Sequence, residues 1–178
     1  MGKRSDFLRR ERDFYPTPYK AVGPLLPHLL YKTRFHEPCA GDGALVDALT
    51  SRGHYLAGAN DVDERRRYMT KDALSLTACS GDYFITNPPW PLPGQQGEPT
   101  VSIALHLSNL APTWLLLSAD FAHNGYFTKS GLAERCKKIV SVGRVSWMEN
   151  GTAGKDNCAW YLFDAKHEGK TQFIGRAA

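Results

Sequence analysis

The chain has 178 residues, of which 42% are hydrophobic and 11% aromatic, and its formal net charge at pH 7 is +4. A chain of this length and composition has room for one globular domain, taken as residues 1–178 with a flexible basic arm over residues 1–12, and not for a second domain of ordinary size. The positive charge indicates a polyanionic partner only weakly, because many basic domains bind no nucleic acid.

Apolar periodicity predicts that helices and strands alternate along the chain. The predicted elements are, in order, helix 18–30, strand 31–36, helix 44–51, strand 54–60, strand 83–86, helix 101–110, strand 114–118 and strands 139–142 and 160–163. Such alternation favours a mainly parallel sheet with helices on both faces. The last two strands are predicted to form an antiparallel hairpin.

The tetrapeptide Asn87-Pro88-Pro89-Trp90 follows directly on strand 83–86, and ligands bind at the carboxyl ends of strands in open α/β sheets. Two prolines make the turn rigid and remove two backbone donors. The Asn87 amide and the Pro88 carbonyl can accept both hydrogens of one NH₂ group, and Trp90 offers a flat face to a planar ring. The turn indicates a site for an amino-bearing base, although taken alone it is also an ordinary strand-ending turn.

A glycine-rich turn lies upstream, between strand 31–36 and helix 44–51, with the sequence Glu37-Pro38-Cys39-Ala40-Gly41-Asp42-Gly43. Its glycines allow the backbone to approach a ligand closely. The turn lacks the Gly-Lys-Ser/Thr of a P-loop and the third glycine of the dinucleotide fingerprint. A pyrophosphate is therefore not the expected ligand.

Five segments together resemble the successive motifs of S-adenosylmethionine-dependent amino-methyltransferases. They are Phe14-Tyr15-Pro16-Thr17-Pro18, the turn at 37–43, Asn60-Asp61, Lys71-Asp72-Ala73-Leu74 and Asn87-Pro88-Pro89-Trp90. The likeness spans residues 13 to 165 and is greatest to small DNA adenine methyltransferases of phage and prophage type. It implies an α/β, Rossmann-like class I methyltransferase fold with a mainly parallel seven-stranded sheet, a terminal antiparallel hairpin and helices on both faces.

The resemblance implies S-adenosyl-L-methionine as cofactor, bound by Tyr15, Thr17, Glu37, Pro38, Cys39, Ala40, Gly41, Gly43, Asp61, Asp72 and Asn87. Thr17 would meet the cofactor's carboxylate or only cap the next helix. Glu37 would lie near its amino group or only anchor the turn. Asp61 is suited to accept from both ribose hydroxyls, with Asp63 as the rival. Asp72 would accept from the adenine amino group or cap a turn.

Asn87, Pro88, Pro89 and Trp90 are the predicted catalytic residues. If Asn87 and the Pro88 carbonyl accept both amine hydrogens, the nitrogen lone pair points at the sulfonium methyl and no strong base is required. A base inside a duplex must first be flipped out. Trp90 is predicted to stack on it, and the resemblance implies that Trp147 sandwiches the base from its other side, although Trp147 could instead be a core residue. Trp114 and Trp160 lie in apolar strand patterns and are predicted to be buried.

The predicted partner is DNA, either single-stranded or as a duplex with a flipped base. Arg65, Arg66 and Arg67 are predicted to contact its backbone, with solvated surface as the alternative. No segment has room for a target-recognition domain, so we expect short or low sequence specificity. RNA adenine, a cytosine amino group and a protein glutamine remain alternative substrates, and a non-catalytic cofactor-binding scaffold an alternative class. A homodimer stays open.

Neither a metal nor a membrane is an expected partner. The four cysteines are widely spaced without a Cys-x-x-Cys pair, and no apolar run approaches ~18 residues. The start of the chain leads into charge and not into an apolar stretch, so we expect a cytoplasmic protein of a bacterial or phage-infected cell. The loop 91–99 after the Asn87 turn is predicted to be either a lid or a plain connector.

Overall fold

The computed structural model of the chain describes residues 15–63, 68–91, 94–147 and 157–176. Two sequence predictions lie outside these residues: the basic arm over residues 1–12 and the Arg65-Arg66-Arg67 cluster.

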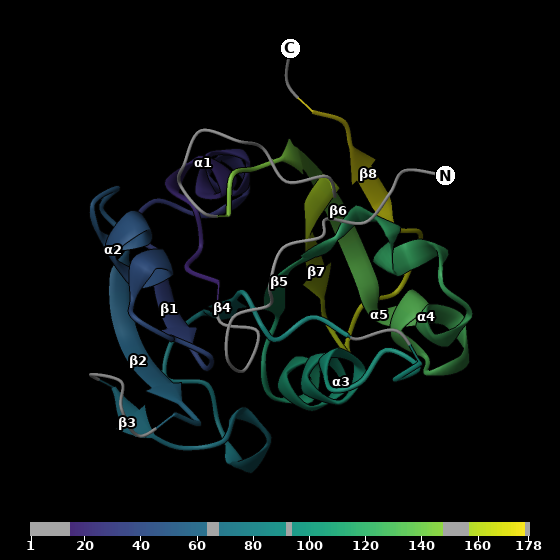
Figure 1. Cartoon of the computed structure of the whole chain (residues 1–178), viewed down its shortest axis with the longest axis horizontal. Helices are drawn as coiled ribbons and strands as arrows, with labels where there is room; N and C mark the ends of the chain where they lie inside the picture. Colours follow the sequence, from purple (N-terminus) through teal and green to yellow (C-terminus); the bar gives the residue numbers. More distant parts are fainter. Residues whose placement is uncertain (1–14, 64–67, 92–93, 148–156, 177–178) are drawn as a thin grey trace.

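Short helices and eight strands make up the described part of the chain (Figure 1). In order they are α1 (Tyr19–Val22), η2 (Gly23–His28), β1 (Arg34–Glu37), α2 (Ala44–Thr50), β2 (Tyr55–Asp61), β3 (Met69–Thr70), η3 (Ala73–Ser75), β4 (Tyr83–Thr86), α3 (Thr100–Leu110), β5 (Thr113–Ser118), η4 (Ala119–His123), α4 (Gly125–Lys129), α5 (Leu132–Arg135), β6 (Cys136–Arg144), β7 (Asn157–Phe163) and β8 (Gln172–Ile174).

The strands form one mixed sheet in the order β3-β2-β1-β4-β5-β7-β6-β8. β1 pairs in parallel with both β2 and β4, and β4 pairs in parallel with β5. β7 is antiparallel to both of its neighbours, β5 and β6. The predicted fold class is thereby confirmed, including the terminal antiparallel hairpin. Among the described residues the sheet has eight strands and not seven, because β8 extends it beyond β6 as a short parallel edge strand.

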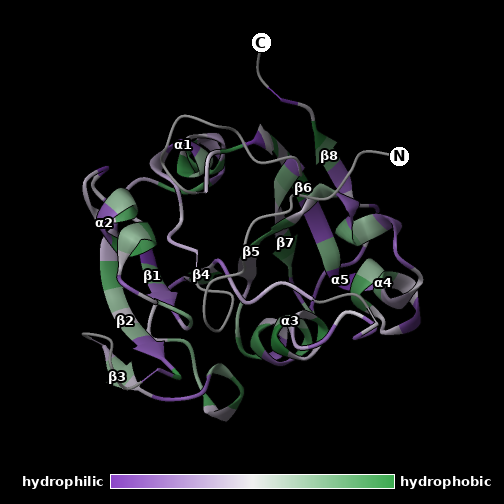
Figure 2. Ribbon diagram, in the orientation of Figure 1, coloured by the Kyte–Doolittle hydropathy of each residue, from purple (hydrophilic) through white to green (hydrophobic). Residues whose placement is uncertain are grey.

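Both faces of the sheet are apolar in the central strands, which explains their continuous hydrophobic sequence. In β5, Trp114 and Leu116 belong to one core cluster, whereas Leu115 and Leu117 belong to another. The same alternation runs through β7. The first cluster packs under α1, η2 and α2, and the second under α3, α4 and α5, so helices cover both faces. Figure 2 shows the hydrophobic residues concentrated on the central strands and on these helices.

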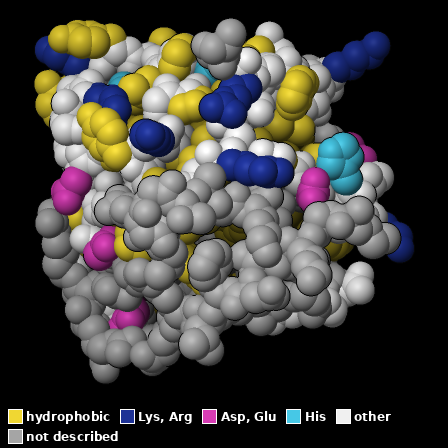
Figure 3. All heavy atoms as spheres, turned by 45° about the horizontal axis from the view of Figure 1, so that its top comes forward, with side chains coloured by type: hydrophobic (Ala, Val, Ile, Leu, Met, Phe, Trp, Pro, Cys, Tyr) yellow, Lys and Arg dark blue, Asp and Glu magenta, His cyan; other side chains and the backbone are white. Residues whose placement is uncertain are grey.

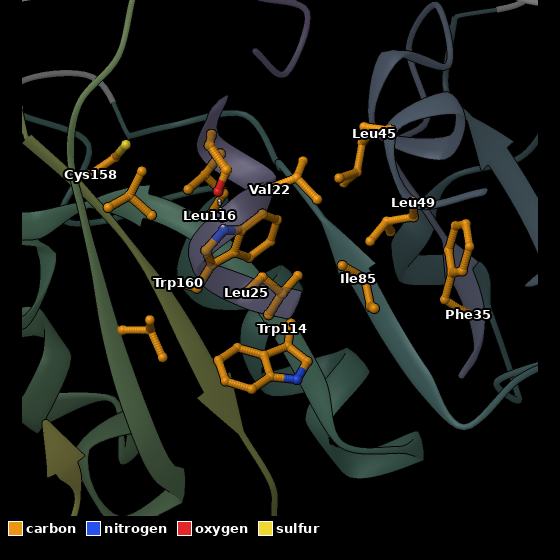
Figure 4. Packing of buried hydrophobic residues seen from close by; sticks show 14 of the residues in the cluster. Val22, Leu25, Phe35, Leu45, Leu49, Ile85, Trp114, Leu116, Cys158 and Trp160 are labelled. Atoms are coloured by element: carbon orange, nitrogen blue, oxygen red, sulfur yellow. Dashed lines mark hydrogen bonds between the residues drawn. The ribbon is translucent and has the colours of Figure 1, made fainter. Parts of the chain in front are cut away.

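The first core layer is centred on two tryptophans (Figure 4). Trp114 and Trp160 are fully buried, as predicted from their strand patterns. The Trp160 indole N–H donates to the Ala21 carbonyl of α1 at 2.8 Å. This bond ties α1, which directly follows the Tyr15–Pro18 segment, to the centre of the sheet.

The predicted helix over 18–30 is wrong in its type and length. Only Tyr19–Val22 is α-helical, and Gly23–His28 continues as a 3₁₀ helix. Pro24 and Pro27 lie in this second segment, and each lacks the N–H that an α-helical bond requires. No helix in the described ranges is long and apolar enough to cross a membrane.

Candidate active site

The sheet order brings the predicted motifs to the same end of the parallel strands. β1 lies between β2 and β4, and all three are parallel, so the segments that follow them leave the sheet at the same end. The turn after β1, Asp61 at the end of β2 and Asn87 after β4 are therefore neighbours. The carboxyl end of β1, β2 and β4 is therefore the candidate site.

The glycine-rich turn is anchored by Asp61. Asp61 Oδ2 accepts a hydrogen bond from the Gly41 N–H at 2.7 Å, and Oδ1 accepts from the Asp63 N–H at 2.8 Å. Each carboxylate oxygen has a further lone pair, so these bonds leave acceptor capacity for a ligand. The ribose role of Asp61 stays a prediction, and Asp61 has in addition a structural role that its sequence motif did not indicate.

Position 43 favours glycine through its backbone conformation and through a close neighbouring side chain. Gly43 has φ +92° at the start of α2, a left-handed conformation that side chains rarely adopt. The Tyr68 hydroxyl also lies only 2.5 Å from where a Cβ of residue 43 would be. Tyr68 therefore lies against the turn, and no sequence motif pointed to it.

Asn60 joins three segments of the site that are distant in sequence. Its Nδ2 donates to the Pro38 carbonyl at 3.1 Å and to the Lys71 carbonyl at 2.8 Å. The His36 ring is 2.8 Å from Asn60 Oδ1 through Nε2, and its Nδ1 accepts from the Ser80 N–H at 3.4 Å, so Nε2 carries the proton. Asn60 is 2% exposed and holds the turn after β1 next to the segment that begins at Lys71.

Glu37 is the most strongly perturbed carboxyl group of the site. It is 1% exposed, and its Oε1 accepts from the Cys39 N–H at 3.2 Å. Glu37 Oε2 and the hydroxyl of the buried Thr86 have no hydrogen-bond partner among the described residues. Burial raises the pKa of Glu37 to about 8, opposed only in part by the nearby Thr86 hydroxyl and the Cys39 N–H. Two unpartnered buried polar atoms at one point suit a ligand with a polar, positively charged group.

The raised pKa of Glu37 predicts how stability depends on pH. Between its ordinary value of 4.5 and about 8, the folded protein keeps a proton that the unfolded chain releases. The free energy of unfolding should therefore fall as pH rises through this window, by up to about 1.4 kcal/mol per pH unit from this group. The Glu37→Gln side chain stays neutral and should flatten that part of the profile. Denaturant unfolding at a series of pH values across the window measures the free energy of unfolding and its slope.

Glu134→Gln is the matched control, because Glu134 is an exposed glutamate in α5. It should leave the wild-type slope unchanged. Wild-type and Glu37→Gln profiles of equal slope would contradict the raised pKa.

The hydrogen bonds at the starts of α1 and η3 bear on two alternatives that the sequence left open, the capping roles of Thr17 and Asp72. Thr17 does not cap α1, whose N-cap residue is Pro18 and lacks a side-chain cap. Asp72 does cap: its Oδ1 accepts from the Leu74 N–H at 2.9 Å at the start of η3. This bond uses one oxygen of an exposed carboxylate, and the predicted contact of Asp72 with adenine remains a prediction.

The Asn87 turn presents two acceptors. Asn87 Nδ2 donates to the Tyr15 carbonyl at 3.4 Å, which turns its Oδ1 away from the Tyr15 segment. Within the described ranges, no hydrogen bond reaches Asn87 Oδ1 or the Pro88 carbonyl. The contact also brings the Tyr15 motif to the turn, 72 residues away in sequence.

Three aromatic side chains gather beside this turn. The Trp90 indole N–H donates to the Leu116 carbonyl of β5 at 3.0 Å, which fixes its ring. Trp147 meets Trp90 with ring centroids 5.3 Å apart at 84°, and Tyr15 meets Trp147 at 6.5 Å and 67°. Trp90 and Trp147 are therefore in edge-to-face contact and not parallel. A base stacked on the face of Trp90 would meet Trp147 at an angle, and the sandwich of a base by both rings stays a prediction.

The remaining predicted positions add little geometry of their own. Cys39 is half-buried, burial raises the pKa of its thiol, and all four cysteines are free. No group of three His, Cys, Asp or Glu side chains able to hold a metal is found in the described part of the chain. Residues 92–93 lie outside the described ranges, and the lid predicted over 91–99 stays a prediction.

Comparison of the sequence with protein-family models and with curated proteins gives no match. Solved structures do match. A Pyrococcus horikoshii protein provisionally assigned as an RNA methyltransferase has a TM-score of 0.59 at 14% identity, over 91% of this chain and 93% of its own. The methyltransferase subunit of a type I restriction-modification system from Streptococcus thermophilus has a TM-score of 0.59 at 12% identity, over 90% of this chain and 47% of its own.

A dimethyladenosine transferase from Plasmodium falciparum has a TM-score of 0.54 at 13% identity, over 85% of this chain and 62% of its own. This chain spans about half the length of the restriction-modification subunit. At these identities the likeness shows the fold, which is the Rossmann-like fold of methyltransferases.

Proposed function

We propose that the protein transfers a methyl group from S-adenosyl-L-methionine to the exocyclic amino group of adenine in DNA. The observation that supports this most is the pair of acceptors without a protein donor, Asn87 Oδ1 and the Pro88 carbonyl, next to the ring of Trp90 within the described ranges. An amino group that donates both hydrogens to this pair would lie beside an aromatic platform.

The residues at the ends of β1 and β2 fit the cofactor. Glu37 offers a buried oxygen, unpartnered among the described residues, for its ammonium group, and Asp61 keeps acceptor capacity for the ribose hydroxyls. Gly41 and Gly43 add no side chain of their own to the turn before α2, where the Tyr68 side chain lies against position 43. When bound, S-adenosylmethionine supplies an electrophilic methyl on a cationic sulfur.

The protein's part in the reaction is alignment. The delocalised lone pair of an aromatic amine is a poor nucleophile, and two hydrogen-bond acceptors on its hydrogens favour a tetrahedral nitrogen whose lone pair faces the methyl group. Asn87 cannot act as a base at pH 7, and it has no need to, because the nitrogen becomes acidic after it gains the methyl. The proton then leaves to solvent.

DNA as partner is supported by positive charge at the same end of the strands as the candidate site. Arg144 ends β6, and Arg176 follows β8, which is parallel to β6; both are exposed. Arg176 also lies over Gly143. Trp147 is three residues beyond Arg144, so these cations flank the aromatic site. Figure 3 shows Lys and Arg side chains spread over the described part of this side of the molecule.

Binding to DNA should therefore weaken with salt, and less steeply in an Arg144→Ala/Arg176→Ala variant. Removing one phosphate contact lowers the slope of log affinity against log salt by about 0.9 for duplex and about 0.7 for single strands. The control is Lys166→Ala/Lys170→Ala, which removes the same amount of charge. These two lysines follow β7, at the other end of the strands from the Asn87 turn. Equal slopes in all three proteins would reject these phosphate contacts. The same measurement on alanine variants of Arg65, Arg66 and Arg67 tests the predicted cluster there.

The test of the function is transfer of a labelled methyl group to DNA, RNA and protein in parallel. Label in DNA is the expected result, in adenines that share a context of at most a few bases. Exclusive label in RNA would favour the second candidate, an RNA adenine methyltransferase. The fold likeness to the P. horikoshii protein supports this candidate. Label in protein alone, or cofactor binding with no transfer to any polymer, would reject the proposal.

A further inference from the structure

The Asn87-Pro88-Pro89-Trp90 turn has a third carbonyl acceptor, and that acceptor is already engaged. The Thr100 hydroxyl donates to the Pro89 carbonyl at 2.7 Å. Thr100 is the first residue of α3 and is fully buried. The bond spans 11 residues and closes the base of the loop that leaves the turn.

We propose that Thr100 is a positioning residue of methyl transfer, which holds the Pro89 carbonyl so that the Pro88 carbonyl and Asn87 Oδ1 are the two acceptors presented to the substrate amine. The inference rests on the proposed function and deepens it. It assigns to α3, which no sequence motif connects with the site, the task of selecting the acceptors.

The hydrogen bonds already described link the Asn87-Pro88-Pro89-Trp90 turn to three other segments of the chain. Asn87 is bonded to the Tyr15 carbonyl, Pro89 to Thr100 and the Trp90 indole to the Leu116 carbonyl. The proline rings fix φ at residues 88 and 89 but leave ψ of Pro89 free, and ψ orients the Pro89 carbonyl. The Thr100 bond removes this freedom. Without it, the Pro89 carbonyl can turn toward the site and compete for the amine.

Misdirected acceptors would affect the chemical step more than cofactor binding, because Glu37 and Asp61, which are proposed to hold the cofactor, end β1 and β2 and lie outside the Asn87 turn. Thr100→Val keeps the shape of the side chain and removes the donor. It is expected to lower kcat by roughly 10- to 100-fold, the scale of a misplacement of about 1 Å, while affinity for S-adenosylmethionine stays within about twofold. Thr100→Ser restores the hydroxyl and is expected to retain kcat within about threefold of wild type.

A matched control is available in β5. Thr113 is also fully buried, and its hydroxyl donates to the Ala111 carbonyl at 2.8 Å, at the opposite end of the sheet from the Asn87 turn. Thr113→Val removes an equivalent bond and should lower thermal stability about as much as Thr100→Val, with kcat unchanged. Should Thr100→Val fail to bind cofactor, Thr100→Cys, with its weak thiol donor, replaces it in the comparison with Thr100→Ser.

The experiment measures kcat, KM and cofactor affinity for wild type and these variants on methyl-accepting DNA. A loss of kcat in Thr100→Val that Thr100→Ser rescues, and that Thr113→Val lacks, supports the proposal. Wild-type kcat in Thr100→Val, or an equal loss in Thr113→Val, overturns it while the proposed function stands. A wild-type protein that binds cofactor but methylates no polymer rejects the proposed function itself, and the role of Thr100 with it.

Discussion

Asn87→Ala is expected to lower turnover by at least about 100-fold, the scale seen when one pre-organised hydrogen-bonding group is removed from an active site. In the proposed mechanism Asn87 Oδ1 is one of two acceptors for the amine, and a single acceptor does not orient the nitrogen. Affinity for S-adenosylmethionine should stay within a few-fold, because the interaction acts mainly on the transferring nitrogen. Single-turnover transfer and calorimetry of cofactor binding measure the two effects separately.

Asn109→Ala is the control for this prediction. Asn109 is exposed near the end of α3 and accepts a hydrogen bond from Arg135 at 2.7 Å, away from the Asn87 turn. It should transfer methyl groups at the wild-type rate. Near-normal turnover by Asn87→Ala would defeat the mechanism, and a cofactor affinity reduced as much as turnover would move Asn87 from catalysis to binding.

Asp61→Ala is expected to weaken binding of S-adenosylmethionine by roughly 1.5–3 kcal/mol, the scale of a lost hydrogen bond to a charged group. That corresponds to about 10- to 150-fold in the dissociation constant. Two causes act together. On the proposed assignment the ribose loses its acceptor. The Gly41 and Asp63 N–H groups lose theirs as well, so that the glycine turn is no longer held in place. The fold should be retained.

Asp82→Ala separates these causes from a general loss of stability. Asp82 is an exposed aspartate whose Oδ2 accepts from the Arg34 N–H at 2.8 Å at the opposite end of β1. It loses a comparable bond and should bind cofactor normally. Calorimetry is the measurement, and unchanged affinity in Asp61→Ala would reject the assignment and transfer the ribose role to Asp63.

The parts of the fold that follow from local pattern were predicted well. The strand Tyr83–Thr86 has the predicted bounds, and the helix and strand that follow it differ by one residue. The apolar strand patterns correctly indicated that Trp114 and Trp160 are buried. The helix over 18–30 was wrong because Pro24 and Pro27 outweigh its apolar pattern, and β8 was missed because its three residues, largely exposed, carry no periodic signal.

Motifs predicted which segments meet, but not the bonds that hold them. Asn60, Tyr68 and Thr100 act through contacts with residues at least 11 positions away, which only the sheet order and the path of the turns determine. Nothing local distinguishes Thr100 from any threonine at the start of a helix. Likewise, the sequence placed Trp90 and Trp147 together, whereas their edge-to-face angle depends on the bond from Trp90 to Leu116.

The proposed methyl transfer to an amino group is tested most directly by mass spectrometry of nucleosides from random-sequence DNA incubated with the protein and labelled S-adenosylmethionine. We expect label in N6-methyldeoxyadenosine for the wild-type protein and almost none for Asn87→Ala. Label in N4-methyldeoxycytidine would keep the amino-acceptor geometry and change only the base. Label on a ring carbon, as in 5-methyldeoxycytidine, or N6-methyldeoxyadenosine made equally well by Asn87→Ala, would contradict the claim that Asn87 and Pro88 orient an amino group for methyl transfer.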